Sequence, residues 1–331
     1  MLYRERGKDG AWRGGPMMYL KKGLHSPFLA GAFALFCVLA SFGIGNMSQC
    51  NSIAGGLRGV FGVPPKVTGL VTAVLLGAVL LGGLGRISRV TETLVPFMAL
   101  FYMGGALFVL WCFRANLPQA CGQILSAAFD WRAGVGGAAG YGMMQAIRIG
   151  VSRGVFSNEA GLGTAPMAHA AATSASPLVQ ASIGMLDTFI DTIIVCTMTG
   201  FAILVTGQWT SGLTGAAMTS AAFETSLPGI GGIAVTICLT FFAFTTALGW
   251  CVYGERCAIY FFGDKAQIPF RIVYCIAIPV GVLTQLDVVW LLADTCNALM
   301  AIPNLIAILL LSPVLFKLVK EDESKDSIFK H

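Results

Sequence analysis

The sequence contains few charged residues for its length. Only 11% of its 331 residues are Asp, Glu, Lys or Arg, whereas 56% are hydrophobic. A soluble domain carries about 25% charged residues, so the composition excludes an ordinary soluble domain and favours a protein embedded in lipid. The net charge of +5 comes from basic residues that stand mostly between the apolar runs. We therefore expect them to set orientation in a membrane, and we expect no nucleic-acid partner.

Histidines and paired cysteines are also scarce. The three histidines, His25, His169 and His331, are far apart, and none of the ten cysteines belongs to a Cys-x-x-Cys pair. These absences argue against a metal centre and against a disulfide framework. The cysteines stand singly in apolar segments, where they are expected to pack as small apolar side chains. No nucleophile–base pair is apparent either, so the sequence indicates neither an enzyme nor an organic cofactor.

Long apolar runs dominate what is present. Eight can be counted, each about as long as the ~20 residues that cross a bilayer as a helix or longer, and short loops join them. They cover residues 27–57, 67–85, 93–113, 134–172, 178–206, 230–262, 268–286 and 288–318. The pattern predicts an all-α polytopic membrane protein with one transmembrane domain over residues 1–331. Residues 1–26 are expected to form a loop-like start, residues 27–318 the helical bundle, and residues 319–331 a tail. Pro303 is expected to kink or divide the last segment.

Basic residues predict how the chain is oriented. With eight spans both ends lie on one side, and fifteen Lys and Arg residues fall on that side, against four on the other. The four are Arg58, Lys66, Arg114 and Arg132. Because positive charge gathers on the cytoplasmic side of membrane proteins, both termini are predicted to be cytoplasmic.

Segment 134–172 is too long for one span. A single helix of that length would reach about 58 Å, against a hydrocarbon core of about 30 Å. Gly154, Gly161, Gly163 and Pro166 surround its polar centre, "VFSNEA", and Gly and Pro favour unwinding. A broken helix is therefore predicted. Unwound backbone at membrane depth is tolerated where it lines protein or a watery cavity, and in secondary transporters it forms substrate and ion sites.

Glu159 lies at the centre of this segment and has two interpretations. It could belong to a substrate site. Alternatively, it could pair with Arg153 or Arg148 and brace the fold, because an isolated carboxylate in a membrane is costly.

Several motifs resemble one family of transporters. "RGVFSNEAGLGTAPMAHAAA" (153–172) closely resembles the signature of the alanine or glycine:cation symporter family, the sodium:alanine symporters of bacteria and archaea. "SFGIGNMSQCNSIA" (41–54), "FIDTIIVCTMTG" (189–200) and "FAFTTALGWCVYGERC" (242–257) are similar to it as well. The resemblance implies a LeuT-like inverted-repeat transporter fold in a bacterial inner membrane. It also implies that a sodium gradient drives import of alanine or glycine.

The first segment carries candidate substrate ligands. Asn46 and Gln49 are three residues apart and are expected to share a helix face. The resemblance places this helix beside the substrate, and Gln49 is the preferred contact because an amide both donates and accepts hydrogen bonds. The alternative is that these amides only bond neighbouring helices.

Two other segments complete the candidate site. In the broken segment, the substrate-binding candidates are Phe156, Ser157, Asn158, Gly161 and Gly163. In the sixth segment, Thr245 and Thr246 are the candidate sodium ligands implied by the resemblance. Adjacent helical residues point about 100° apart, so one of the two threonines is expected to bind and the other to pack. Asp187 and Asp191 suggest either a cation path or pairing inside the bundle.

The resemblance also implies that part of the fold is missing. Family members carry helices before the loop that contains "GGPM" (14–17), so the eight spans look like helices three to ten of the core. The chain is thus expected to be N-terminally incomplete, to lack the first two core helices, and not to transport alone. The alternative functions are a non-transporting remnant or a partner subunit of a split transporter.

Overall fold

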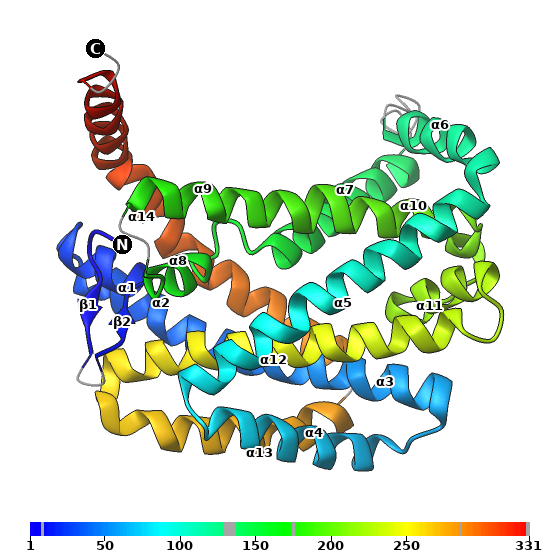
Figure 1. Cartoon of the computed structure of the whole chain (residues 1–331), viewed down its shortest axis with the longest axis horizontal. Helices are drawn as coiled ribbons and strands as arrows, with labels where there is room; N and C mark the ends of the chain where they lie inside the picture. The colour runs from blue at the N-terminus through cyan, green and yellow to red at the C-terminus, as the bar shows by residue number, and fades with distance from the viewer. Residues whose placement is uncertain (8–9, 129–136, 174–175, 285, 329–331) are drawn as a thin grey trace.

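A computed structural model describes the chain except residues 8–9, 129–136, 174–175, 285 and 329–331. The described residues are helical almost throughout, and each of the eight apolar segments coincides with one or more helices (Figure 1). The main elements are β1 (Glu5–Arg6), β2 (Trp12–Arg13), α1 (Pro16–Lys22), α2 (Pro27–Ala40), η1 (Ser41–Ser48), α3 (Gln49–Phe61), α4 (Pro65–Leu80), α5 (Leu84–Cys112), η2 (Arg114–Asn116), α6 (Leu117–Ala128), α7 (Gly137–Asn158), α8 (Ala165–Ala170), α9 (Pro177–Thr188), η4 (Phe189–Cys196), α10 (Thr197–Val205), η5 (Gln208–Thr210), α11 (Gly215–Ser226), α12 (Gly231–Phe262), η6 (Asp264–Ala266), α13 (Gln267–Leu283) and α14 (Leu286–Ile328).

Among the described residues, six helical stretches are long and apolar enough to cross a membrane. They are Pro27–Phe61, Leu84–Cys112, Pro177–Val205, Gly231–Phe262, Asp264–Leu283 and Val288–Asp322. Helix α4 is apolar but only 16 residues long, and α7 contains the polar centre of the broken segment. The structure is thus that of a helical membrane protein, while the number of eight spans stays a prediction.

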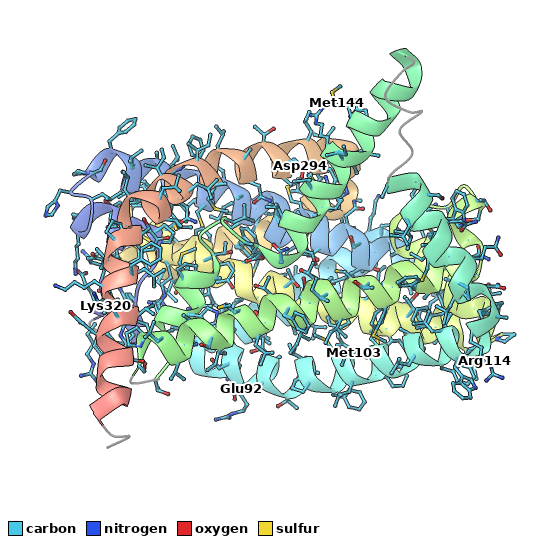
Figure 2. The ribbon with its side chains drawn as sticks, turned by 90° about the horizontal axis from the view of Figure 1, so that it is seen from above. Glu92, Met103, Arg114, Met144, Asp294 and Lys320 are labelled. Atoms are coloured by element: carbon cyan, nitrogen blue, oxygen red, sulfur yellow. The ribbon has the colours of Figure 1, made fainter. Side chains whose placement is uncertain are left out.

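The two ends of the chain differ from the sequence prediction. The loop-like start contains an antiparallel hairpin, in which Glu5 pairs with Arg13, and it also contains helix α1. The tail expected from residue 319 is the end of helix α14, which continues to Ile328. Helix α14 also passes Pro303 without dividing. In Figure 2 the part of α14 that carries Lys320 turns steeply from the part that carries Asp294, and prolines inside a helix are a usual cause of such bends.

Helix α12 lies at the centre of the bundle and contacts α2, α3, η1, α5 and α11 (Figure 1). It contributes side chains to three hydrophobic clusters: Trp250 to the first, Leu248 to the second and Val235 to the third. Its polar residues Thr236, Thr245, Glu255 and Arg256 are buried. Polar and charged side chains of a membrane helix face the interior of the bundle rather than lipid, which fits the central position of α12, on which the functional site is built.

Two spans contain π-helical segments, η1 and η4. A π-helix has more residues per turn than an α-helix and often marks a functional site. The side-chain amide of Gln49, the first residue of α3, donates to the carbonyl of Ile44 in η1 at 3.2 Å. Both segments border the same cavity, to which η1 contributes Ile44 and η4 contributes Asp191 and Val195.

Candidate functional site

The predicted break in segment 134–172 is present. Helix α7 ends at Asn158 and α8 begins at Ala165. Between them Glu159, Gly161 and Gly163 have φ angles of 53°, 78° and 94°, in the left-handed region, which L-residues other than glycine seldom adopt. Gly163 must also be small, because a Cβ there would lie 2.5 Å from Pro16 Cγ and 2.8 Å from Phe33 Cε2. Tight packing on both sides thus keeps the chain unwound at this point.

A cavity of about 490 Å³, here called the central cavity, lies beside this break. Its walls come from η1, α3, α5, the end of α7, η4, α10, α11 and α12. Most of its polar groups are hydroxyls, joined by one amide and two carboxylates. They belong to Gln49, Ser52, Tyr102, Ser157, Glu159, Asp191, Thr199, Thr219, Thr236, Thr240 and Thr246. Such a set of oxygen atoms suits a small polar ligand and a hard cation.

Four of the nine residues predicted from the sequence line the central cavity, namely Gln49, Phe156, Ser157 and Thr246. They come from three segments that are distant in the sequence. The Phe156 ring also packs against Trp290, with ring centroids 4.9 Å apart.

The other five predicted residues do not line the central cavity. The buried Asn46 donates its amide to the carbonyl of Tyr274 at 2.6 Å. Asn158 accepts a hydrogen bond from the backbone N–H of Ala160. Thr245 donates to backbone carbonyls one turn earlier in α12. Gly161 and Gly163 shape the break rather than the cavity wall.

Several cavity residues were not among the predicted ligands. Along α12, Thr236, Thr240, Ala243, Thr246 and Trp250 all face the cavity. Their spacing of three or four residues is that of one helical face, so the polar stripe could have been found in the sequence. Ser52, Thr199 and Tyr102 belong to other spans and carry no comparable signal.

The described lining of the central cavity is acidic. It includes Glu159 and Asp191 but no lysine or arginine. Asp191 accepts a hydrogen bond from the Ser157 hydroxyl at 2.7 Å, and this bond joins the end of α7 to η4. Arg153 pairs with Asp294 at 2.5 Å and stacks on the Trp290 ring, 4.2 Å from its centroid. Arg153, one of the two predicted partners of Glu159, is therefore engaged elsewhere, and Glu159 lines the central cavity, where a carboxylate favours a cationic ligand.

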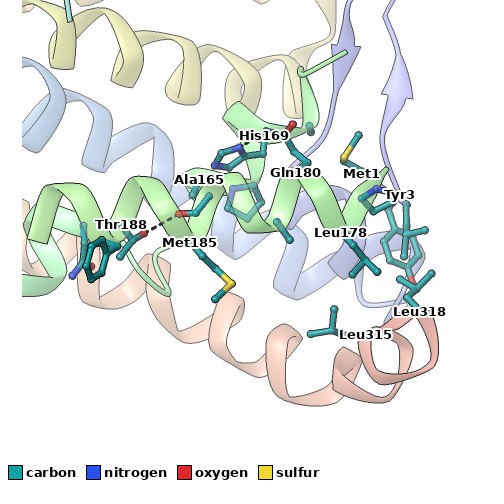
Figure 3. Close-up of a pocket in the computed structure, with 18 of the residues that line it drawn as sticks. Met1, Tyr3, Ala165, His169, Leu178, Gln180, Met185, Thr188, Leu315 and Leu318 are labelled. Atoms are coloured by element: carbon teal, nitrogen blue, oxygen red, sulfur yellow. Dashed lines mark hydrogen bonds between the residues drawn. The ribbon is translucent and has the colours of Figure 1, made fainter. Parts of the chain in front are cut away.

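A larger groove of about 840 Å³ lies on the other side of α7 and η4 (Figure 3). Asn158 and Thr192 face this groove, whereas their neighbours Ser157 and Asp191 face the central cavity. Figure 3 shows His169 and Gln180 together in the groove, with the Gln180 amide donating to His169 Nδ1 at 2.7 Å. Leucine, methionine, proline and alanine form most of the rest. The groove therefore offers fewer polar contacts to a small charged ligand than the central cavity does.

Comparison with known proteins identifies the relatives of this chain. The model of the sodium:alanine symporter family matches residues 1–328. The sodium/alanine symporter AgcS of Methanococcus maripaludis is 44% identical, with 98% of this chain and 74% of AgcS aligned. An uncharacterized transporter of Haemophilus influenzae is also 44% identical, over 96% of this chain and 71% of its own length. The probable sodium/glutamine symporter GlnT of Bacillus subtilis is 35% identical, over 99% of this chain and 69% of GlnT.

These matches cover nearly the whole of the present chain and about 70% of each relative. They lend no support to the expectation of a truncated chain that cannot transport.

Proposed function

Because this chain belongs to the sodium:alanine symporter family, we propose that it is a sodium-coupled symporter that imports a small amino acid such as alanine or glycine. The observation that carries the proposal is the central cavity, which gathers Gln49, Ser157, Glu159 and Thr246 beside a broken helix. The similarity to AgcS, whose name describes a sodium/alanine symporter, supports alanine as the first substrate to test. The proposal includes a LeuT-like inverted-repeat fold for the helical bundle.

The substrate is placed between the break and α12. An amino acid carries an ammonium and a carboxylate. The ammonium is attracted to Glu159 and Asp191 and can donate to the Ser157 hydroxyl oxygen, while the second N–H of the Gln49 amide can donate to the carboxylate. Phe156 and Trp250 line the same space and enclose a small apolar side chain. Asn158, Gly161 and Gly163 contribute through the shape and backbone of the break, and Asn46 through the position of η1.

Sodium is placed on the α12 side of the cavity. It prefers hard oxygen ligands, and Thr246 lines the cavity one turn from Trp250. Thr245 donates its proton to backbone carbonyls, which leaves oxygen lone pairs available to a cation. Thr246 is the primary ligand in this proposal and Thr245 the secondary one.

The end of the bundle that carries the hairpin is placed in the cytoplasm of the bacterial inner membrane. The hairpin, the turn between α12 and α13, and the C-terminal part of α14 all lie at the left of Figure 1. These segments are rich in lysine and arginine, and Arg114 lies at the other end of the bundle (Figure 2). The positive-inside rule supports cytoplasmic termini.

The test is uptake by the purified full chain in liposomes. We expect labelled alanine to accumulate when sodium is higher outside, and not when potassium replaces sodium. Unlabelled alanine, glycine and glutamine, added in separate reactions, report which side chain the cavity accepts. Accumulation that is indifferent to the sodium gradient would overturn the coupling, and no uptake of any small amino acid would overturn the proposed function.

A further inference from the structure

The end of α12 lies beside the N-terminal hairpin (Figure 1). A second polar cavity, here called the basic cavity, is formed there. Its volume is about 360 Å³, and it is bounded by the hairpin, α1 and the last turns of α12. Five cationic side chains line it: Arg6, Arg13, Lys21, Lys22 and Arg256. Two acidic side chains, Glu5 and Asp264, face them.

The two carboxylates do not balance this charge. Lys22 pairs with Glu5 at 2.7 Å, and Arg13 pairs with Asp264. Each carboxylate is thus held by one cation, and the charges of the described lining residues sum to a positive value. Arg256 is only 6% exposed, so part of this charge lies where water screens it poorly. A cavity of this kind attracts an anion with several oxygen acceptors, such as a phosphate group.

An apolar groove adjoins the basic cavity. It has a volume of about 1130 Å³ and lies between the first half of α2 and the ends of α12 and α13. Lys265 is the one charged residue among those that line it. The side chain of Phe28 is 82% exposed there and that of Phe262 77%, which in a membrane protein means contact with lipid.

Two aromatic rings join these spaces. Tyr260 lines the basic cavity and Phe261 lines the groove, and their ring centroids are 5.5 Å apart. The Lys21 ammonium lies 5.7 Å from the centroid of the Tyr260 ring. A cationic cavity and an exposed apolar groove therefore meet at the same end of α12, the arrangement that an amphipathic ligand requires.

We propose that this end of α12 binds an anionic phospholipid, with its phosphate in the basic cavity and its acyl chains along the apolar groove. A free phosphate would satisfy the cations but leave the groove without a role. A zwitterionic lipid would fill the groove but bring its own cation into a cavity that is already positive. Basic pockets at the cytoplasmic surface of transmembrane bundles are suited to anionic headgroups.

The experiment measures lipid binding to the delipidated full chain by native mass spectrometry, with phosphatidylglycerol and phosphatidylethanolamine as probes. The test variant is the double substitution Arg6→Gln and Lys21→Gln, since both side chains are exposed. The control is Lys66→Gln, which is also exposed but lies in the first turn of α4. Each lysine or arginine near an anionic headgroup contributes about 1 kcal/mol. Affinity for phosphatidylglycerol should therefore fall at least roughly tenfold in the double variant and stay unchanged in the control.

Inorganic phosphate and a short-chain phosphatidylglycerol distinguish the lipid from a free anion. A lipid site holds the long-chain lipid much more tightly than either competitor. If inorganic phosphate displaces it as effectively as the lipid itself, the cavity is a soluble-anion site and the proposal is wrong. Equal binding of phosphatidylglycerol to the wild type and the double variant would overturn it as well.

Discussion

Gly45 of η1 lies directly against Trp250 of α12. A Cβ built on Gly45 would be 2.1 Å from the Cβ of Trp250 and 2.5 Å from its Cγ, closer than non-bonded carbon atoms can approach. Trp250 in turn lines the central cavity and is only 2% exposed. The absence of a side chain at residue 45 therefore fixes where this wall of the cavity stands.

Gly45→Ala should therefore impair transport strongly, although the substitution adds only one methyl group. The added methyl group must push Trp250 toward the cavity or separate η1 from α12, and overpacking of this kind costs about 1–3 kcal/mol. We expect a loss of alanine uptake and a lower thermal midpoint in detergent. Gly59→Ala is the matched control, because nothing lies within 4 Å of its added Cβ in α3. Equal uptake and stability in the two variants would show that the contact is not limiting.

Asp191 and Ser157 give a second prediction, on the acidic wall of the cavity. Asp191→Asn keeps the size of the side chain but removes its charge, so it should raise the sodium concentration needed for half-maximal uptake, on the order of tenfold. Ser157→Ala removes the hydroxyl that donates to Asp191 and should have a smaller effect, because the charge remains. Glu92→Gln is the control, since Glu92 points away from the bundle on α5 (Figure 2). An unchanged sodium dependence in Asp191→Asn would exclude Asp191 from the cation path.

The sequence alone was sufficient to predict part of the central cavity's lining, but not the rest of it. The length of segment 134–172 and its glycines predicted the break, because both conditions are local. Asn46 and Gln49 were expected on one helix face from their spacing, but only Gln49 reaches the cavity. Between them the π-helix η1 ends at Ser48 and the α-helix α3 begins at Gln49, and this change of helix type alters the turn and therefore the face. No local sequence pattern indicates this change of helix type, because it depends on the packing of η1 against α12, α13 and α14.

Thr245 and Thr246 show the same limit at a smaller scale. Spacing alone predicted that one of them binds and the other packs. In the structure, Thr246 lines the central cavity. Which of the two threonines faces the central cavity depends on how α12 is rotated about its own axis relative to the elements around it. That rotation is set by contacts with nine other elements, all of them well separated from the pair in the sequence.

Glu255 and Arg271 give a third prediction, which concerns stability. They form an ion pair of 2.6 Å between α12 and α13, with side chains 1% and 2% exposed, and Arg271 also donates to the carbonyl of Leu80. Removing one partner of a buried pair leaves a buried charge without compensation and costs about 3–5 kcal/mol. Glu255→Gln should therefore lower the free energy of unfolding in micelles by about that amount. Lys317→Gln, in an exposed pair with Glu321, should change it by less than about 1 kcal/mol.

The last prediction concerns Glu224, at the connection from α11 to α12. Its carboxylate accepts hydrogen bonds from the backbone N–H groups of Gly229 and Gly232, the latter at 2.7 Å, and these bonds hold the pKa of Glu224 below its ordinary value of 4.5. A carboxyl whose pKa is lower in the folded state contributes stability above its unfolded pKa, and this contribution disappears as the pH falls through the folded pKa. Wild type should therefore be more stable than Glu224→Gln at pH 7, and the difference should narrow once the pH falls below about 4.5. Thermal unfolding of both proteins between pH 7 and pH 3 measures it, with Glu92→Gln as the control for general acid effects. A difference that stays constant over this range would mean that the stabilisation does not depend on the charge of Glu224.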